Sequence, residues 1–222
     1  MIDLDQLTVR IIYDNTEPQE GFEADWGFSC VIEGTGKTIL FDTGGKGDIF
    51  MKNLTAAGVS PSDIDIVVIS HKHWDHIGGL GSFLEAKGDV KVYVPVSFEP
   101  DVKKEIAAGC TELVEVADPL EVLPGVYSTG DMDGPVREQS LALKTDRGAV
   151  VITGCAHPGI DRIVAQAAEV AGDDVLCVMG GFHLGRAGEK KLEQIASRFD
   201  GSGVKYCGAS HSTGDESIEF FT

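Results

Sequence analysis

The segment 65–80, which reads DIVVISHKHWDHIGGL, constrains the fold of this chain more than any other. It begins with an apolar run, and three histidines and an aspartate follow within six residues, directly before two glycines. A strand this apolar is buried on both faces, as the inner strands of parallel sheets are. The segment therefore predicts an α/β fold in which an inner strand delivers several coordinating side chains to one place.

The rest of the chain alternates short apolar strands with helical patterns and glycine turns. We expect helices at 48–58, 77–88, 100–109, 161–171 and 189–199, the first of them capped by Asp48. We expect strands or extended pieces at 10–15, 28–34, 37–45, 65–70, 90–96, 120–130, 175–181 and 204–210, a hairpin at 140–154, and an edge strand at 217–221. The length of 222 residues suits one domain, so we expect a single α/β domain over residues 1–222.

Composition limits the partners. The formal net charge is −18 and no basic cluster offsets it, so the surface repels the phosphate backbone of nucleic acids. An anionic small molecule would need a bound metal to supply positive charge. No run approaches the ~20 apolar residues of a membrane span, no signal peptide is visible, and five cysteines without a C-x-x-C pair indicate reduced thiols. We expect a cytoplasmic protein with a small-molecule substrate, no nucleic-acid partner and no membrane.

All six histidines stand after apolar strands. One strand leads to the cluster at 71–76, and three others lead to His157, His183 and His211. In an α/β sheet the loops beyond one end of the strands converge, so four strands are expected to deliver histidine to one rim. The alternative is that the lone histidines occupy separate polar loops with no shared role. Imidazole is the commonest protein ligand for zinc and similar ions, which favours a metal site.

The spacing inside HKHWDH fits two adjacent ions. His71 and His73 lie two residues apart in extended backbone, so their side chains point to the same side. Asp75 and His76 enter the first helical turn and point in a different direction. The glycine pair at 78–79 lets the helix start approach the site without obstruction by a side chain.

These residues resemble the metallo-β-lactamase superfamily. Its H-x-H-x-D-H motif is met in full by residues 71–76, and its strand ending in Asp-Thr-Gly is met by ILFDTGG, which places Asp42 as a buried support. The resemblance implies a four-layer αβ/βα sandwich of two mixed β-sheets flanked by helices. TGCAHPGI, MGGFHL and the late HSTG resemble a branch of metal-dependent hydrolases labelled as a dihydropterin ribofuranosyl-aminobenzene phosphate synthase. Without the resemblance, Asp42 could equally be a simple turn aspartate before Gly44.

The resemblance also implies the ligands of two divalent ions, with zinc first and manganese or iron next. One ion would be held by His71, His73 and His157, and the other by Asp75, His76 and His211. The chain departs from the family in its second half, because no Gly-Asp stands where a bridging aspartate should follow a strand. Either His183 or Cys155 could take that position. Cys155 could equally be a small buried apolar residue, and His183 could instead hydrogen-bond to a ligand.

Hydrolysis by a metal-bound hydroxide is the reaction that this resemblance implies. Asp75 would orient the nucleophile and His183 would protonate the leaving group. The branch suggests a phosphoester or another small ester-like substrate, related to a pterin. Some basic residues near the rim could contact a phosphate or be plain surface charges: Lys72, Arg162, Arg186 and Lys190. The alternative function is a non-catalytic or mononuclear metal-containing protein that binds a small ligand.

Other activities on the same fold are less well supported. Di-iron reductases of the superfamily carry Glu at the position of His73 and a flavin domain beside the iron domain. The absence of a signal peptide disfavours extracellular lactam hydrolysis, and the net charge of −18 disfavours RNA processing. Glu138 and Asp14 resemble acidic positions near the pocket of the branch, but taken alone they indicate solvated surface.

Overall fold

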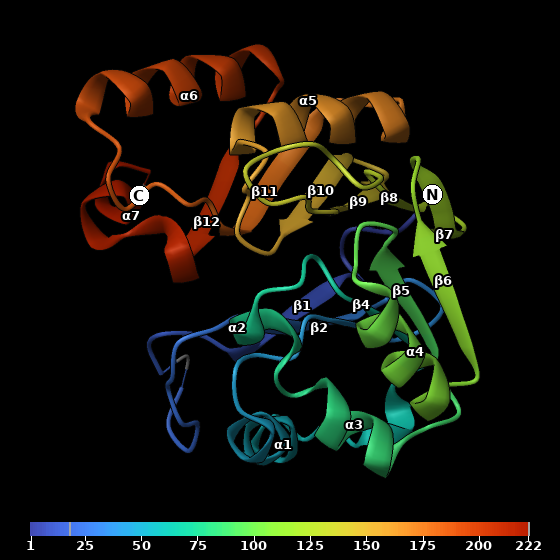
Figure 1. Ribbon diagram of the computed structural model, residues 1–222. Helices are drawn as coiled ribbons and strands as arrows, with labels where there is room; N and C mark the ends of the chain where they lie inside the picture. The colour runs from blue at the N-terminus through green and yellow to red at the C-terminus, as the bar shows by residue number, and fades with distance from the viewer. Residues whose placement is uncertain (18, 222) are drawn as a thin grey trace. The chain divides into compact units, whose positions relative to one another are not determined.

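Residues 1–17 and 19–221 are described by the computed structural model, and they divide into two units (Figure 1). The N-terminal unit spans Gln6–Ala117, and the C-terminal unit combines Met1–Asp5 with Asp118–Thr222. Each unit holds one six-stranded mixed sheet flanked by helices. The expected α/β class with two mixed sheets is therefore confirmed, while the single-domain organisation stays a prediction.

The sheet of the N-terminal unit has the strand order β1-β2-β3-β4-β5-β6. β1, β2 and β3 pair antiparallel, and β3 to β6 pair parallel. The strands span Thr8–Tyr13, Ser29–Glu33, Ile39–Phe41, Ile66–Val68, Lys91–Pro95 and Glu112–Val116. All three residues of β4 are buried, as its apolar sequence and its position between two parallel neighbours predict.

The described residues of this unit form the α-helices α1 (Gly47–Ala56), α2 (Trp74–Ile77), α3 (Leu80–Ala86) and α4 (Pro100–Gly109), with a 3-10 turn at Pro61–Asp63. α1 and α3 pack against each other (Figure 1). Phe50 of α1 meets Phe83 of α3 edge to face, with ring centroids 6.4 Å apart. Both rings are fully buried and form part of the apolar core of the unit.

The ends of α1 match the sequence pattern only in part. Asp48 lies in the first helical turn and no side chain caps the helix, so the prediction that Asp48 caps it was wrong. A carboxylate in the first turn is still favourable, because the helix dipole is positive there. At the other end Gly58 has a φ of 72°, and the Val59 N–H donates to the Leu54 carbonyl oxygen at 3.1 Å. This is the Schellman pattern expected after a helix that ends in glycine.

The sheet of the C-terminal unit has the order β12-β11-β10-β9-β8-β7. β7 to β10 pair antiparallel, and β10, β11 and β12 pair parallel. The strands β7 to β12 span Leu120–Leu123, Val126–Ser128, Leu141–Thr145, Gly148–Thr153, Val175–Gly181 and Tyr206–Ser210. The predicted hairpin at 140–154 is confirmed, because β9 and β10 pair from Thr145 and Gly148 onward.

Three helices complete this unit: α5 (Ile160–Ala171), α6 (Glu189–Gly201) and α7 (Asp215–Phe220), with a 3-10 turn at His211–Thr213. α5 packs over β8 to β11 and beside α6 (Figure 1). Within the described residues, no helix is long and apolar enough to span a membrane. All five cysteines are free in the described part of the chain, and their reduced state stays a prediction.

The predicted edge strand at 217–221 was wrong, because this segment forms α7 and the turn after it. Gly214, with a φ of 83°, starts the helix, and Asp215 follows in the first turn, where a negative charge is favourable. Phe221 then packs against Phe182 and Phe199, with ring centroids 6.0 and 5.7 Å away. Five residues, both polar and apolar, are too few to distinguish the 3.6-residue repeat of a helix from the 2-residue repeat of a strand. The packing of the aromatic side chains decides in favour of the helix.

The junction between α2 and α3 depends on the glycine pair Gly78 and Gly79. A Cβ added at Gly78 would lie 2.1 Å from the carbonyl oxygen of Gly45, and one added at Gly79 would lie 2.3 Å from that of Thr43. Both distances are far inside van der Waals contact. The pair therefore allows a close backbone approach, as predicted, and the approaching segment is the loop after β3.

We expect Gly79→Ala to destabilise the protein by about 1–3 kcal/mol, because the added methyl group has no room beside the Thr43 carbonyl. Gly81→Ala is the matched control. Gly81 lies in α3, and an added Cβ there would meet no heavy atom within 4 Å outside its own helix. That change should stabilise the helix by about 0.5–1 kcal/mol. Urea unfolding followed by circular dichroism measures both, and equal shifts would contradict the packing argument.

Candidate metal-binding clusters

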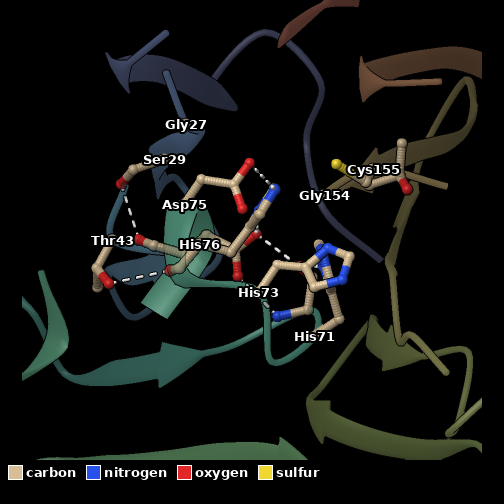
Figure 2. A network of polar contacts seen from close by, with 12 residues as sticks. Gly27, Ser29, Thr43, His71, His73, Asp75, His76, Gly154 and Cys155 are labelled. Atoms are coloured by element: carbon tan, nitrogen blue, oxygen red, sulfur yellow. Dashed lines mark hydrogen bonds and ion pairs between the residues drawn. The ribbon is translucent and has the colours of Figure 1, made fainter. Parts of the chain in front are cut away.

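Ligand-type side chains gather at the carboxyl ends of two parallel strands in the N-terminal unit (Figure 2). Asp42 follows β3, and the segment 70–76 follows β4, which pairs parallel with β3. Parallel neighbours end at the same edge of a sheet, so the loops after them meet. α2 begins inside this segment and places Asp75 and His76 close to His71 (Figure 2).

The four side chains of the motif lie close together. His71 Nε2 lies 3.1 Å from His73 Nδ1, and His76 Nε2 lies 3.8 Å from Asp75 Oδ2. The His71 and His76 ring centroids are 4.2 Å apart. Two nitrogen ligands, each about 2.0–2.1 Å from a tetrahedral zinc ion, lie roughly 3.3 Å from each other. The His71–His73 separation therefore fits two ligands of one ion.

A buried carboxylate orients these imidazoles. Asp42 is fully buried and accepts hydrogen bonds from the Ser70 N–H (2.7 Å), the Ser70 O–H (2.6 Å) and His76 Nδ1 (2.7 Å). Because the Ser70 hydroxyl donates its only hydrogen to Asp42, its oxygen can only accept, so the His71 Nδ1–H donates a hydrogen bond to it at 2.9 Å. His71 and His76 are then both protonated on Nδ1, which leaves a lone pair on Nε2 for a metal. This is the supporting position that the family resemblance implied for Asp42.

Burial also affects the pKa of the Asp42 carboxyl. It raises the pKa of the Asp42 carboxyl, and the contacts with His76 and Ser70 oppose that rise. Burial raises the pKa of the neighbouring Cys30 thiol, with a further rise from the Asp42 charge. Cys30 therefore stays a neutral thiol beneath the cluster.

A second cluster lies in the C-terminal unit, at the carboxyl ends of the parallel strands β10, β11 and β12. Cys155 and His157 follow β10, His183 follows β11, and His211 is buried directly after β12. The donor atoms of Cys155, His157 and His183 lie within 4.8 Å of one another, and the two imidazole centroids are 4.4 Å apart. The Cys155 side chain raises the pKa of His183, and burial opposes this effect.

The loop that carries Cys155 and His157 is held by Glu138, which is fully buried. Its Oε1 accepts hydrogen bonds from the backbone N–H groups of residues 154, 155 and 156 at 3.2, 2.9 and 3.0 Å. Its Oε2 accepts one from the His157 N–H at 2.9 Å. One carboxylate thus fixes four consecutive backbone groups.

The interpretation of Glu138 and Asp14 as solvated surface was therefore wrong. Asp14 is only 8% exposed, and the Asn15 N–H donates to its Oδ1 at 2.6 Å. No local pattern marks Glu138, because its backbone partners lie 16 to 19 residues further along the chain. Its resemblance to an acidic position of the branch was the one available signal.

Backbone strain marks both clusters independently of their chemistry. In the described part of the chain, four non-glycine residues have positive φ: Asp42 (56°), Ala156 (59°), His183 (52°) and His211 (45°). They follow β3, β10, β11 and β12, the strands that lead into the clusters. The left-handed region costs a residue with a Cβ roughly 1–2 kcal/mol, and such strain concentrates at functional sites.

Two exposed tryptophans belong to the N-terminal unit. Trp74 is 58% exposed and Trp26 is 51% exposed. The Trp74 ring packs on Gly45, where an added Cβ would lie 2.5 Å from its Cζ3. Because Trp74 stands between His73 and Asp75 in the motif, an exposed aromatic surface directly adjoins the ligand-type side chains.

Some basic residues expected near a phosphate have partners of their own. Lys72 forms an ion pair with Glu99, and Arg162 donates to two backbone carbonyl oxygens at 2.9 and 3.0 Å. Arg186 and Lys190 are exposed. Phosphate contacts by these residues stay a prediction.

We expect Glu138→Ala to destabilise the protein by about 3 kcal/mol or more, because several buried N–H groups lose their acceptor. Glu138→Gln keeps one oxygen acceptor and should lose about 1–2 kcal/mol. Glu169→Ala, at an exposed position of α5 in the same unit, should stay within about 0.5 kcal/mol of the wild type. Chemical unfolding compares the three, and a Glu138→Ala variant as stable as Glu169→Ala would refute the role of the carboxylate.

His183→Gly should be more stable than His183→Ala by about 1 kcal/mol, since both remove the imidazole and only alanine keeps a Cβ at positive φ. The same pair at Glu169, inside α5, should show the opposite order, with glycine about 1 kcal/mol less stable. Thermal unfolding of the four variants tests this. If alanine is at least as stable as glycine at position 183, the backbone there is not strained.

Known proteins are similar to this chain in sequence and in fold. The family model described as the metallo-beta-lactamase superfamily matches residues 27–135. A relative from Methanocaldococcus jannaschii, named 7,8-dihydropterin-6-methyl-4-(beta-D-ribofuranosyl)-aminobenzene-5'-phosphate synthase, is 27% identical over 95% of this chain and 90% of its own. Metallo-beta-lactamase domain-containing protein 1 of Xenopus laevis is 38% identical over 60% of this chain and 54% of its own.

A solved structure of a superfamily member is similar to this chain over nearly its whole length. The crystal structure of a metal-dependent hydrolase of the beta-lactamase superfamily matches with a TM-score of 0.81 and 27% identity. The match covers 97% of this chain and 91% of the other. By sequence and by fold, this chain resembles the metallo-β-lactamase superfamily: residues 27–135 match the family model, and 97% of the chain matches a solved hydrolase of that superfamily.

Proposed function

We propose that the protein is a metal-dependent hydrolase that acts on a small ester-like substrate. The observation that carries this proposal is the pair of ring nitrogens of His71 and His73, which face each other at 3.1 Å. Two facing ring nitrogens at this distance either form one N–H···N hydrogen bond or bind one cation between them. The hydrogen-bond chain through Ser70 to Asp42 leaves the Nε2 lone pair of His71 directed at that position.

The ligand set that we propose follows the family resemblance. We assign His71, His73 and His157 to one ion, and Asp75, His76 and His211 to the other. Zinc is the metal proposed first, with manganese or iron next, since imidazole and carboxylate donors suit all three. When bound, such ions polarise an oxygen of the substrate and lower the pKa of water so that it reacts near neutral pH.

The chain's own residues would supply the proton transfers. Asp75 is buried, with its carboxylate 3.8 Å from His76 Nε2. A carboxylate beside the ligands accepts a hydrogen bond from the attacking water and so orients it. His183 has two roles open to it, because its exposed imidazole could donate a proton to the leaving group or bind an ion.

We propose a phosphoester related to a pterin as the substrate. The name of the Methanocaldococcus jannaschii relative contains both a dihydropterin and a ribofuranosyl 5'-phosphate. The exposed Trp74 and Trp26 of this chain offer aromatic surface for a planar heterocycle. We also propose a cytoplasmic location and no nucleic-acid or membrane partner, in keeping with the net charge of −18.

The first test is hydrolysis by the purified protein after removal of metal and reloading with zinc, manganese or iron, on ester, thioester, lactone and phosphodiester substrates. We expect metal-dependent turnover of at least one of them. Asp42→Ala should lower activity or metal affinity by roughly 10–100-fold, because His71 and His76 lose the group that orients them. Asp48→Ala removes an exposed carboxylate of the same unit and should leave both unchanged.

Ligand binding distinguishes the alternative function. The chain has two tryptophans, so its indole fluorescence comes only from Trp26 and Trp74, and quenching by an added pterin reports binding near them. Binding without turnover of any substrate under any metal would contradict the hydrolase. It would support a metal-containing small-ligand-binding protein instead.

A further inference from the structure

Cys155, His157 and His183 bring one sulfur and two ring nitrogens to within 4.8 Å of one another inside the C-terminal unit. The first two follow β10, and the third follows its parallel neighbour β11. The set is therefore built by adjacent strand ends of a single sheet.

The backbone around this set is fixed before any ion binds. Glu138 accepts hydrogen bonds from the N–H groups of both Cys155 and His157, at 2.9 Å each. Ala156, between them, has a φ of 59°, and His183 has a φ of 52°. A loop that served only to bury a small cysteine would need neither a buried carboxylate nor two strained residues.

We propose that Cys155 binds metal as a thiolate, with His157 and His183 as its imidazole partners in the C-terminal unit. The inference rests on the proposed metal-dependent function and changes its ligand set, because His157 then shares an ion with Cys155 and His183 instead of with His71 and His73. It gives His183 the role of a ligand and leaves Asp75 as the residue that orients the nucleophile. On binding, the S–H bond of Cys155 breaks, the sulfur–metal bond forms and the proton passes to solvent.

A set of one thiolate and two imidazoles selects among metals. Sulfur and imidazole donors suit zinc, cobalt and ferrous iron, whereas magnesium, calcium and manganese prefer oxygen donors. The inference therefore favours zinc or iron over manganese as the working metal. It also makes the protein sensitive to oxidation, because a sulfur carrying oxygen is no longer a thiolate ligand.

Cobalt substitution tests the sulfur ligand directly. The full chain is stripped of metal, reduced and titrated with Co²⁺, and its absorption spectrum is recorded. We expect visible d–d bands together with a near-ultraviolet thiolate-to-cobalt charge-transfer band. Cys155→Ser should keep the d–d bands, lose the charge-transfer band and weaken cobalt binding, because a hydroxyl is a poorer donor than a thiolate. Cys177→Ser, at a half-buried position of β11, is the matched control and should keep the band.

X-ray absorption of the zinc-loaded wild type makes the test independent of any substitution. A sulfur scatterer at about 2.3 Å, beside nitrogen at about 2.0–2.1 Å, is the expected result. Wild-type protein that binds cobalt with d–d bands but no charge-transfer band, or zinc with no sulfur scatterer, would overturn the inference and leave the hydrolase intact. A charge-transfer band in a protein that hydrolyses no substrate would support the sulfur ligand and contradict the proposed hydrolase.

Discussion

A buried carboxylate beneath each ligand-bearing loop is the constraint on which the rest of the site depends. A charge in the interior is tolerated only when its hydrogen-bonding capacity is filled. Asp42 takes its donors from Ser70 and His76, and Glu138 takes four backbone N–H groups from the loop after β10. Each loop therefore adopts the conformation that satisfies its carboxylate, and the ligand-type side chains are oriented by the protein before any metal arrives.

Much of the fold could be predicted from sequence, because its inner strands are apolar throughout. β4, β10 and β11 were found in this way, and the histidine-bearing loops were found because they follow such strands. Errors arose where tertiary contacts decide. The sequence of α7 predicts a strand, and the packing of Phe221 decides for a helix. The strand β6 is not predicted, because its sequence ELVEV does not alternate strictly between charged and apolar residues.

In the candidate site, the ligand-type residues could be predicted from sequence, and the residues that hold them in place could not. Candidate metal ligands are drawn from a few residue types, so His71, His73, Asp75 and His76 could be named as candidates from spacing alone. The buried carboxylates of Asp42 and Glu138, which hold the ligand-bearing loops, could not be named from local spacing. Glu138 acts through backbone groups that have no sequence signature, and Asp42 was recognised only through the family resemblance.

The two units differ in how they relate to the superfamily. The matched family model ends at residue 135, so it contains the whole N-terminal cluster and none of the C-terminal one. In the superfamily a bridging carboxylate is usual, and in this chain the resemblance leaves Cys155 or His183 for that position. A change from oxygen to sulfur and nitrogen donors alters which ion fits, so members of one superfamily can diverge in metal preference while keeping the same strands.

The strained residues at the strand ends bear on the history of such a protein. At His183 and His211 the backbone adopts a conformation that glycine would occupy without strain. A descendant released from selection for activity would therefore gain stability by losing these histidines, so that decay of the site is thermodynamically downhill.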